Sequence, residues 1–508
     1  MRIEPAYQDF ETKYQAGEPQ VVWTELVSDL MTPVGAFFKL AEDRANSFLL
    51  ESIRIADGAE VRDRYSIIGL KPDLIWKCRD GQAEINEKAL FDANGFEAAP
   101  TPPLESLRAL VENSKIDLPE SLPPMSAGLF GYLGYDMVRL MEHLPDINPD
   151  TLNVPDAILM RPSIVAIFDV VRDVLTIVTP VRPQDGVSAQ AAFARASERL
   201  NDVVEDLERS LPQAVAHEAD LETLPEPQSN TTHDEYVAMV EKAKEYIRAG
   251  DAFQVVPSQR FRVPFKLPPI ALYRALRRVN PSPYMFFLNF GDFSIVGSSP
   301  EILVRTEGKK VTIRPIAGTR PRGENREQDQ ALEQDLLADP KEIAEHMMLL
   351  DLGRNDTGRV SEIGSVKVTD SFFVEYFSHV MHIISNVEGK LSDEYDSLAA
   401  LIAGFPAGTV SGAPKIRAME IIDELEKEKR GVYAGAVGYF SADGSMDNCI
   451  ALRTAVIKDG TLYVQAGGGV VADSVGETEY QETVNKAKAI FRAADEAVRF
   501  ASRSGGNR

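Results

Sequence analysis

The spacing of apolar residues predicts where the chain changes character. Residues 186–210 carry apolar side chains at helical spacing and predict a helix. Residues 211–232 then lose all periodicity and collect Pro, Glu, Gln, Ser, Asn and Thr, a composition typical of linkers. We therefore predict a boundary in this segment, with one region over 1–225 and a second over 226–508.

Apolar runs on both sides of this boundary predict strands that come in groups. Residues 163–168 and 174–179 are two such runs in the first region. In the second region, Thr232 and Glu235 form a capping-box pattern that opens a helix ending near Gly250. Further strands are predicted at 253–263, 284–290, 293–297, 301–306, 311–316, 434–440, 448–457 and 461–466, and helices at 325–337, 341–352, 413–429 and 477–502. Hairpin-like groups of strands between helices indicate an α+β fold with mainly antiparallel sheets rather than alternating βαβ units.

Composition and charge narrow the class of protein. The 508 residues, 44% hydrophobic and 26% charged, are typical of a soluble globular protein. No apolar leader opens the sequence, and no run approaches the ~18 apolar residues of a membrane span. A formal net charge of −24 disfavours nucleic acid and anionic membranes as partners. Cys78 and Cys449 are too few for a disulfide framework or a thiolate metal cage, so we expect a cytoplasmic protein.

Two pairs of glutamates stand three residues apart on predicted helices. Glu342 and Glu345 form the first pair, and Glu479 and Glu482 form the second. Carboxylates on one face of each helix can converge on Mg²⁺, which takes oxygen ligands. The same spacing is common on solvated helices, so the spacing alone leaves both interpretations open.

Three glycine-containing stretches could hold an anion through exposed backbone N–H groups. Residues 315–323 read PIAGTRPRG, and simple turn chemistry is the alternative interpretation there. Residues 404–415 lack the Gly-Lys-Ser/Thr of a phosphate loop. Residues 467–472 mimic a dinucleotide fingerprint, but only about one helix follows, so no βαβ unit can be completed. Nucleotide binding is therefore disfavoured.

Seven motifs, in this order along the chain, resemble those of the chorismate-utilising enzymes. They are PIAGTRPRG (315–323), AEHMMLLDLGRND (344–356), GTVSGAPK (408–415), GAVGYF (435–440), IALRTA (450–455), QAGGGVVADS (465–474) and ETEYQETVNKAKA (477–489). The resemblance implies a complex α/β sandwich of two packed, mainly antiparallel β-sheets with helices outside. It also implies that 226–508 is the chorismate-binding catalytic region and that 1–225 is a regulatory and scaffold region.

The resemblance implies roles for individual residues as well. Glu345 and Glu482 would hold Mg²⁺ against the ring carboxylate of chorismate, with Glu342 and Glu479 close by. Glu301 would be the general acid for the departing C4 hydroxyl, which needs a proton to leave. The remaining implied residues are His382 for the loss of pyruvate; Gly318, Thr319 and the catalytic Thr409 beside the ring; and Tyr433, Arg453, Gly467, Gly468 and Gly469 for the enolpyruvyl carboxylate. In PIAGTRPRG this leaves structural or solvated roles for Arg320 and Arg322.

Two positions distinguish the branches of this family. Branches that add water carry a lysine base where this chain has Gln254, and the para-aminating branch carries a lysine where this chain has Ala317. Ammonia, unlike water, needs no base to become a nucleophile. The resemblance therefore implies ortho amination of chorismate to anthranilate with release of pyruvate, a lyase reaction of tryptophan biosynthesis. The alternatives are aminodeoxychorismate synthase component I without its usual lysine, and a sensor that has lost catalysis.

The resemblance also predicts partners and an effector. Neither cysteine lies in a nucleophile elbow, so ammonia would come from a separate glutamine amidotransferase subunit, in a heterotetramer. Short strings in both regions resemble the family's tryptophan feedback site. They contain Ser52, Pro283, Tyr284 and Met285.

Overall fold

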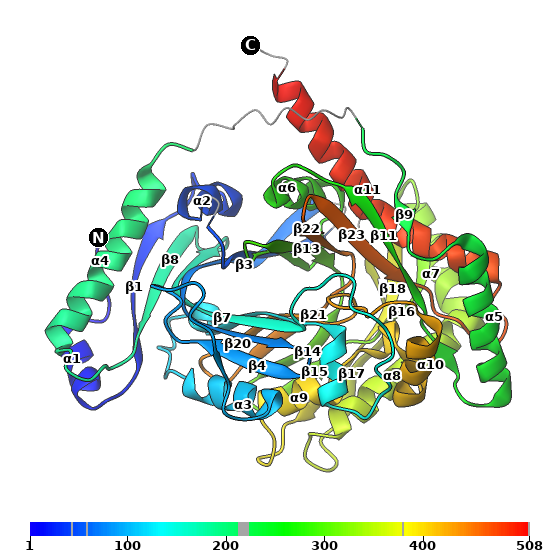
Figure 1. Cartoon of the computed structure of the whole chain (residues 1–508), viewed down its shortest axis with the longest axis horizontal. Coiled ribbons are helices and arrows are strands. Elements are labelled where there is room, and N and C mark those ends of the chain that lie inside the picture. Colours follow the sequence, from blue (N-terminus) through cyan, green and yellow to red (C-terminus); the bar gives the residue numbers. More distant parts are fainter. Residues whose placement is uncertain (42–43, 57–58, 212–222, 378–379, 506–508) are drawn as a thin grey trace.

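The computed structural model describes residues 1–41, 44–56, 59–211, 223–377 and 380–505, without the side chains of 54–63 and 502–505 (Figure 1). Most of the predicted linker, 212–222, lies outside these ranges. None of the described helices is long and apolar enough to cross a membrane.

Antiparallel strands from both predicted regions form a first sheet. In spatial order its strands are β1 (Gln20–Val27), β8 (Val174–Val181), β7 (Ala157–Asp169), β3 (Ala59–Arg79), β2 (Ser47–Ala56), β12 (Tyr284–Asn289), β13 (Phe293–Ser299), β22 (Thr454–Lys458), β23 (Thr461–Gly467), β11 (Ser258–Pro264) and β9 (Gln228–Ser229). Strands on the two sides of residue 225 meet where β2 pairs with β12. The division at residue 225 stays a prediction.

A second antiparallel sheet shares β3 and β7 with the first. It continues through β5 (Glu97–Ala98), β4 (Gln82–Asn86), β6 (Gly128–Leu133), β20 (Ala436–Ser441), β21 (Met446–Ile450), β14 (Ile302–Glu307), β15 (Lys310–Ile313), β18 (Val380–Lys390), β16 (Ile316–Pro321) and β17 (Lys367–Tyr376). The shared pair changes register after Pro72, which lies opposite Pro162. Because proline donates no ladder hydrogen bond, this is where the long strands can bend from one sheet into the other.

One hydrophobic core lies between the two sheets. Phe48, Val165 and Phe286 from the first sheet pack there with Phe130 and Val437 from the second. These side chains point inward because successive residues of a strand face opposite sides of a sheet. The fold prediction of two packed, mainly antiparallel sheets is confirmed.

Helices cover the outer faces of both sheets (Figure 1). On the first sheet lie α1 (Tyr7–Gln15), α2 (Pro33–Leu40), α4 (Ala189–Glu208), α6 (Pro269–Val279) and α11 (Gly476–Gly505). On the second lie α3 (Pro103–Asn113), α9 (Ser397–Gly404) and α10 (Lys415–Leu425), with short 3₁₀ helices at η2 (Tyr135–Leu140) and η3 (Gly408–Val410). A further 3₁₀ helix, η1 (Pro124–Ser126), places Met125 in the core between the sheets. Helix α5 (His233–Ala249) packs on α10, and α7 (Arg326–Ala338) and α8 (Pro340–Gly358) pack on β16 and β18.

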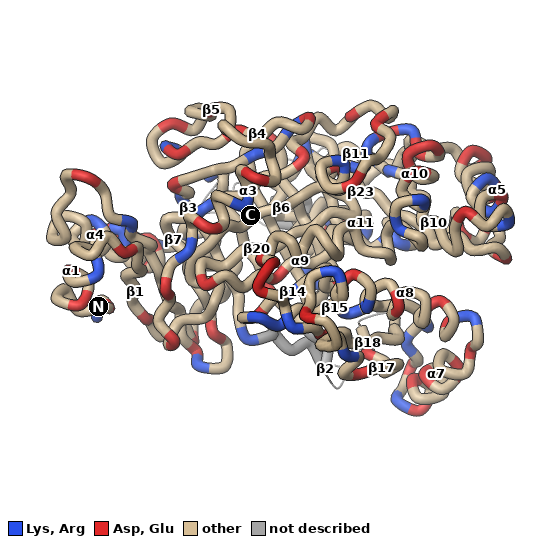
Figure 2. Tube along the Cα trace, turned by 90° about the horizontal axis from the view of Figure 1, so that it is seen from below, with Lys and Arg blue, Asp and Glu red and all other residues tan. Residues whose placement is uncertain are grey.

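Local sequence signals explain several of these boundaries. Helix α5 begins with the predicted capping box, in which Thr232 and Glu235 bond each other's backbone, and ends at Gly250 with φ 87°. Helix α8 begins at Pro340 behind Asp339, whose carboxylate accepts from the N–H of Lys341. Acidic and basic residues are interspersed along α5, α7 and α8 at one end of the molecule (Figure 2).

Candidate active site

Glu301 lies directly before β14, and its side chain is buried. Burial raises the pKa of this carboxyl to about 8, while the neighbouring Thr409 hydroxyl and Arg453 guanidinium oppose the rise. Its backbone oxygen accepts from the N–H of Ile450 at 3.0 Å, which fixes the residue between β14 and β21. Glu301 therefore carries its proton at neutral pH and can give it to a leaving group.

His382 lies on β18 opposite Thr319 of β16. Its Nδ1 is 3.0 Å from the carbonyl oxygen of Gly318 and 3.1 Å from the Thr319 hydroxyl. Burial and then the charge of Arg453 lower the pKa of this imidazole to about 4. The ring is neutral at pH 7, and because Nδ1–H donates to the carbonyl, Nε2 keeps its lone pair for a proton.

Gly318 makes this contact between β16 and β18 possible. Its φ is 75°, and the pairing of β16 with β18 shifts register between Ala317 and Thr319. A Cβ here would lie 3.0 Å from Ile383 and 3.3 Å from Oε2 of Glu342. The stretch 315–323 is thus largely a bulged strand rather than a simple turn, and only glycine fits both its backbone and its surroundings.

The three glycines that follow β23 admit close neighbours. A Cβ at Gly467 would lie 2.9 Å from the Tyr433 hydroxyl, and one at Gly468 would lie 3.2 Å from Oε2 of Glu479. A Cβ at Gly469 would lie 2.5 Å from the Gln254 amide nitrogen. The glycines therefore leave their backbone open toward residues predicted for the site, as a carboxylate cradle requires.

Arg453 joins β21 to β22 in a left-handed conformation with φ 47°. This conformation costs a non-glycine residue roughly 1–3 kcal/mol and is frequent at functional sites. Burial lowers the pKa of the guanidinium, although Glu301 opposes this. No described residue hydrogen-bonds or pairs with this side chain, so its donors are available to an anion.

Each predicted glutamate pair begins in the first turn of its helix, with Glu342 on α8 and Glu479 on α11. Burial, followed by repulsion from Glu342 and Glu482, raises the pKa of Glu345. Burial also raises the pKa of Glu479, with the Ser474 hydroxyl opposing and Glu482 adding to the rise. The charge of Glu482 on α11 raises the pKa of Glu345 on α8, so the two helices bring their carboxylates close together. The N-termini of the helices favour the negative charge.

These carboxylates fit a magnesium ion as a partial ligand set. Within the described ranges, no three His, Cys, Asp or Glu side chains are close enough to enclose a metal. Mg²⁺ commonly takes one or two carboxylates and completes its shell with water and substrate oxygens. The mutual repulsion that raises the pKa of Glu345 is what a divalent cation between Glu345 and Glu482 would relieve.

Lys486 is a site residue that the sequence reasoning missed. Its Nζ donates to the Gly467 carbonyl at 2.9 Å and contacts Glu482 at 2.7 Å, and its side chain is 48% exposed. The sequence does contain a signal for the contact with Glu482, because Glu482 and Lys486 have the i, i+4 spacing of a helical ion pair.

The two arginines of the 315–323 stretch are tied to acidic residues. Arg320 contacts Asp335, Asp339 and Glu342 at 2.7, 2.7 and 3.1 Å. Arg322 pairs with Asp329 at 2.6 Å. These contacts agree with the expected structural roles, and Arg320 also fixes Glu342 beside Gly318.

The four residues predicted for an effector gather in a different place. Ser52 on β2 and Pro283, Tyr284 and Met285 at the start of β12 line one cavity of about 1540 Å³. The lining includes Ile302, the residue after Glu301, but none of the catalytic side chains predicted above. The predicted residues therefore form two groups.

Comparison with known proteins identifies the family of the chain. The family described as chorismate binding enzyme matches residues 71–492. Anthranilate synthase component 1 of Cereibacter sphaeroides is 59% identical over 98% of this chain and 99% of its own length, and that of Pseudomonas aeruginosa is 50% identical over 92% and 94%. The crystal structure of anthranilate synthase component I from Streptococcus pneumoniae matches with TM-score 0.75 and 39% identity over 92% of this chain and 99% of that one. The menaquinone-specific isochorismate synthase of Escherichia coli, at 19% identity and TM-score 0.69 over 96% and 98%, shares the fold.

Proposed function

This chain belongs to the family of chorismate-binding enzymes, and we propose that it converts chorismate and ammonia to anthranilate and pyruvate. The observation that carries the choice of ammonia is Gln254. Its amide nitrogen lies 3.4 Å from Oε1 of Glu345, and its Oε1 is buried with no hydrogen-bond partner among the described residues. The amide oxygen can accept a hydrogen bond from ammonia, but an amide is too weak a base to deprotonate water, whereas a lysine here could do so; ammonia needs no base.

The first step is an amination with loss of water. Arg453, Tyr433 and the glycines 467–469 would bind the enolpyruvyl carboxylate, and Gly318 and Thr319 would contact the ring. Ammonia forms a bond to C2, both ring double bonds shift, the C4–O bond breaks, and the new ammonium group on C2 loses one proton to solvent. Glu301, protonated because burial raises its pKa to about 8, gives its proton to the departing hydroxide. The Thr409 hydroxyl lies near this carboxyl and has no hydrogen-bond partner among the described residues, so it would be available to the substrate.

The second step removes pyruvate and makes the ring aromatic. The proton on C2 leaves as the C3–O bond breaks, and the enolpyruvyl group departs as pyruvate after gaining a proton. His382 can accept the C2 proton at Nε2, because its Nδ1–H donates to Gly318 and burial keeps the ring neutral. The bond to the Gly318 carbonyl also steadies the imidazolium that forms.

Glu345 and Glu482 are the residues that would hold Mg²⁺. When bound, Mg²⁺ supplies positive charge to the ring carboxylate of chorismate. Lys486, whose ammonium contacts Glu482 at 2.7 Å, would lie beside that carboxylate.

We further propose a separate glutaminase subunit as the source of ammonia in the cell. Both thiols of this chain are buried, and burial raises the pKa of Cys78 to about 12 and that of Cys449 as well. Such thiols do not attack glutamine.

We also propose that tryptophan binds the cavity lined by Ser52, Pro283, Tyr284 and Met285, and that the enzyme works in the cytoplasm as part of a heterotetramer.

Product analysis tests the proposed function. The purified chain, incubated with chorismate, Mg²⁺ and ammonium, should yield anthranilate fluorescence and stoichiometric pyruvate. Glutamine in place of ammonium should give none. A para-aminated or hydroxylated chorismate as the product would overturn the proposal and favour another branch of the family.

A further inference from the structure

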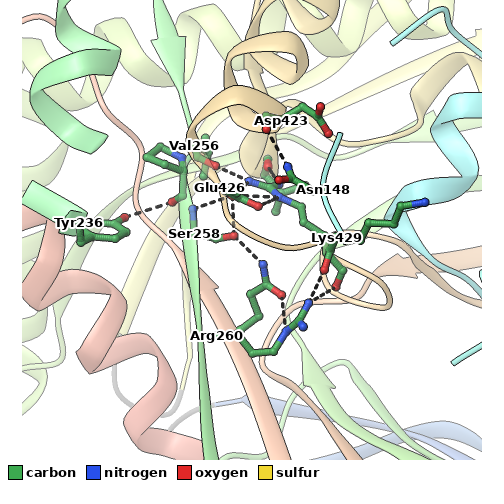
Figure 3. Close-up of polar contacts among 12 residues, drawn as sticks. Asn148, Tyr236, Val256, Ser258, Arg260, Asp423, Glu426 and Lys429 are labelled. Atoms are coloured by element: carbon green, nitrogen blue, oxygen red, sulfur yellow. Dashed lines mark hydrogen bonds and ion pairs between the residues drawn. The ribbon is translucent and has the colours of Figure 1, made fainter. Parts of the chain in front are cut away.

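Behind the Tyr433 side of the site lies an ion pair that no step of this reaction uses. Arg430 and Glu426 are 2% and 7% exposed, and Nη2 of Arg430 is 2.6 Å from Oε1 of Glu426. Figure 3 shows Glu426 among polar contacts that reach Val256 and Ser258. Replacing a buried ion pair by apolar residues is often neutral or stabilising, so stability alone does not explain this one.

Arg430 joins two backbone segments that carry predicted site residues. Nη1 donates to the carbonyl of Val410, the neighbour of Thr409, at 2.7 Å. Nη2 donates to the carbonyl of Val256, just after Gln254 and β10 (Gln254–Val255), also at 2.7 Å. The planar guanidinium offers donors in fixed directions, so these two bonds set the distance between the segments.

Glu426 holds the same support from the other side. One of its oxygens accepts from the N–H and the hydroxyl of Ser258, at 2.8 and 2.7 Å. Ser258 pairs with Gly467 in the sheet, and the Gly468 N–H donates to the Pro257 carbonyl at 3.2 Å. The glycine cradle therefore lies on the segment that the ion pair fixes.

The guanidinium also lies between two tyrosine rings. Its carbon is 4.8 Å from the ring centre of Tyr135 and 5.4 Å from that of Tyr433. Cation–π attraction at these distances holds both rings in place. The orientation of Tyr433, whose hydroxyl faces Gly467, thus depends on Arg430.

We propose that Arg430, held by Glu426, is a positioning residue that sets the enolpyruvyl-carboxylate side of the chorismate site. It touches no substrate atom. It fixes Tyr433, the segment under Gly467–Gly469 and the loop of Thr409 relative to one another. This inference rests on the proposed function, because it assigns chorismate to that cradle.

Arg430→Lys is the test. Lysine keeps the charge for Glu426 but has a point-like ammonium that cannot hold both carbonyls and lie flat between the rings. A misplacement of about 1 Å can cost ~10²-fold in an enzyme. We expect KM for chorismate to rise by roughly tenfold or more, within that range, with KM for ammonium unchanged and kcat changed much less. Ser258→Ala, which removes one bond to Glu426, should raise KM for chorismate less.

Arg161→Lys is the matched control. Arg161 also bonds a carboxylate twice, Asp73 at 2.7 and 3.1 Å, but lies on β7 away from the site. It should lower the melting temperature and leave KM unchanged. Wild-type KM for chorismate in both Arg430→Lys and Ser258→Ala, with any loss of activity following the melting temperature, would overturn the proposal. The affinity for chorismate, measured by calorimetry, should rank the variants in the same order and does not depend on turnover. If the wild-type chain made no anthranilate, the proposed function would fail, and the calorimetric ranking would still test the role of Arg430.

Discussion

The active site and the cavity of about 1540 Å³ between the sheets use charge in opposite ways. In the active site, burial disfavours the charged forms of the two groups that would transfer protons. Burial keeps Glu301 protonated and His382 neutral, with pKa values of about 8 and about 4. In the cavity, Arg305 pairs with Asp447 at 2.7 Å, and both residues also contact the Tyr284 hydroxyl.

The difference shows that the volume of a cavity does not identify the catalytic site in this molecule. A cavity with paired charges can select and hold a ligand, but it offers no group poised to exchange a proton. Shifted pKa values together with hydrogen-bond geometry identify the reacting groups. We therefore expect variants in the two regions to separate catalysis from inhibition.

The largest effect is expected for Glu301→Gln, which removes the proton donor and keeps the shape. Turnover of chorismate should fall by ~10²–10⁴-fold, the usual contribution of a general acid. Steady-state anthranilate formation measures this, with tryptophan affinity by calorimetry expected to stay at the wild-type value. Glu25→Gln, at an exposed pair with Arg172, is the control.

The pH dependence checks the same residue. Wild-type kcat/KM for chorismate, which reports the ligand-free enzyme, should decline as pH rises through about 8, where Glu301 loses its proton. Because this pKa is raised above its ordinary value of 4.5, the stability that the carboxyl contributes is present below about 4.5 and lost as pH rises through about 8. The variant should lose that slope in a series of thermal melts. A wild-type rate that stays flat well above pH 8 would contradict the assignment.

A second, smaller effect is expected for Glu345→Gln and Glu482→Gln. Removing one carboxylate weakens magnesium binding and leaves the ring carboxylate of chorismate less neutralised, so activity at fixed Mg²⁺ should fall by about 10²-fold or more. Titration of Mg²⁺ by calorimetry should show weaker binding in each variant. Unchanged magnesium dependence in both would refute the metal assignment.

Ser52→Ala should have the smallest effect and act only on inhibition. We expect the tryptophan concentration for half-inhibition to rise by roughly tenfold, within the usual range of coupling between sites, with kcat and KM unchanged. Inhibition curves for both proteins measure it. Equal inhibition of wild type and variant would remove Ser52 from the effector site and weaken the contrast between the two regions.

Local sequence signals predicted much of the fold. The capping box of Thr232 opens α5 as expected, and the apolar runs at 163–168 and 174–179 lie in β7 and β8. The missed features depend on tertiary contacts. Strand β17 is exposed over its first half and lacks an apolar stripe, and the bend at Pro72 needs Pro162 as its partner.

The site residues also divide into those that the sequence motifs predict and those whose contacts depend on the tertiary fold. Motif order placed residues such as Glu301 and Glu345 in one group, but the contact of His382 with Gly318 depends on the register of two strands. Lys486 was overlooked because a helical Glu–Lys pair is ordinary on a surface. Its bond to the Gly467 carbonyl appears only when α11 is packed on the end of β23.

The pairing of β2 with β12, and of β6 with β20, has a consequence during synthesis. Leu50 pairs with Phe286, and Tyr132 pairs with Val437. Strands β2 and β6 are therefore synthesised long before the strands with which they pair. Until then β2 and β6 are open edges, the kind of surface on which chains associate wrongly. Pairings between strands far apart in sequence also slow folding, because the entropy cost of closing a long loop comes before the stabilising contacts form. The yield of active enzyme should therefore depend on translation speed and chaperone supply as well as on the stability of the finished fold.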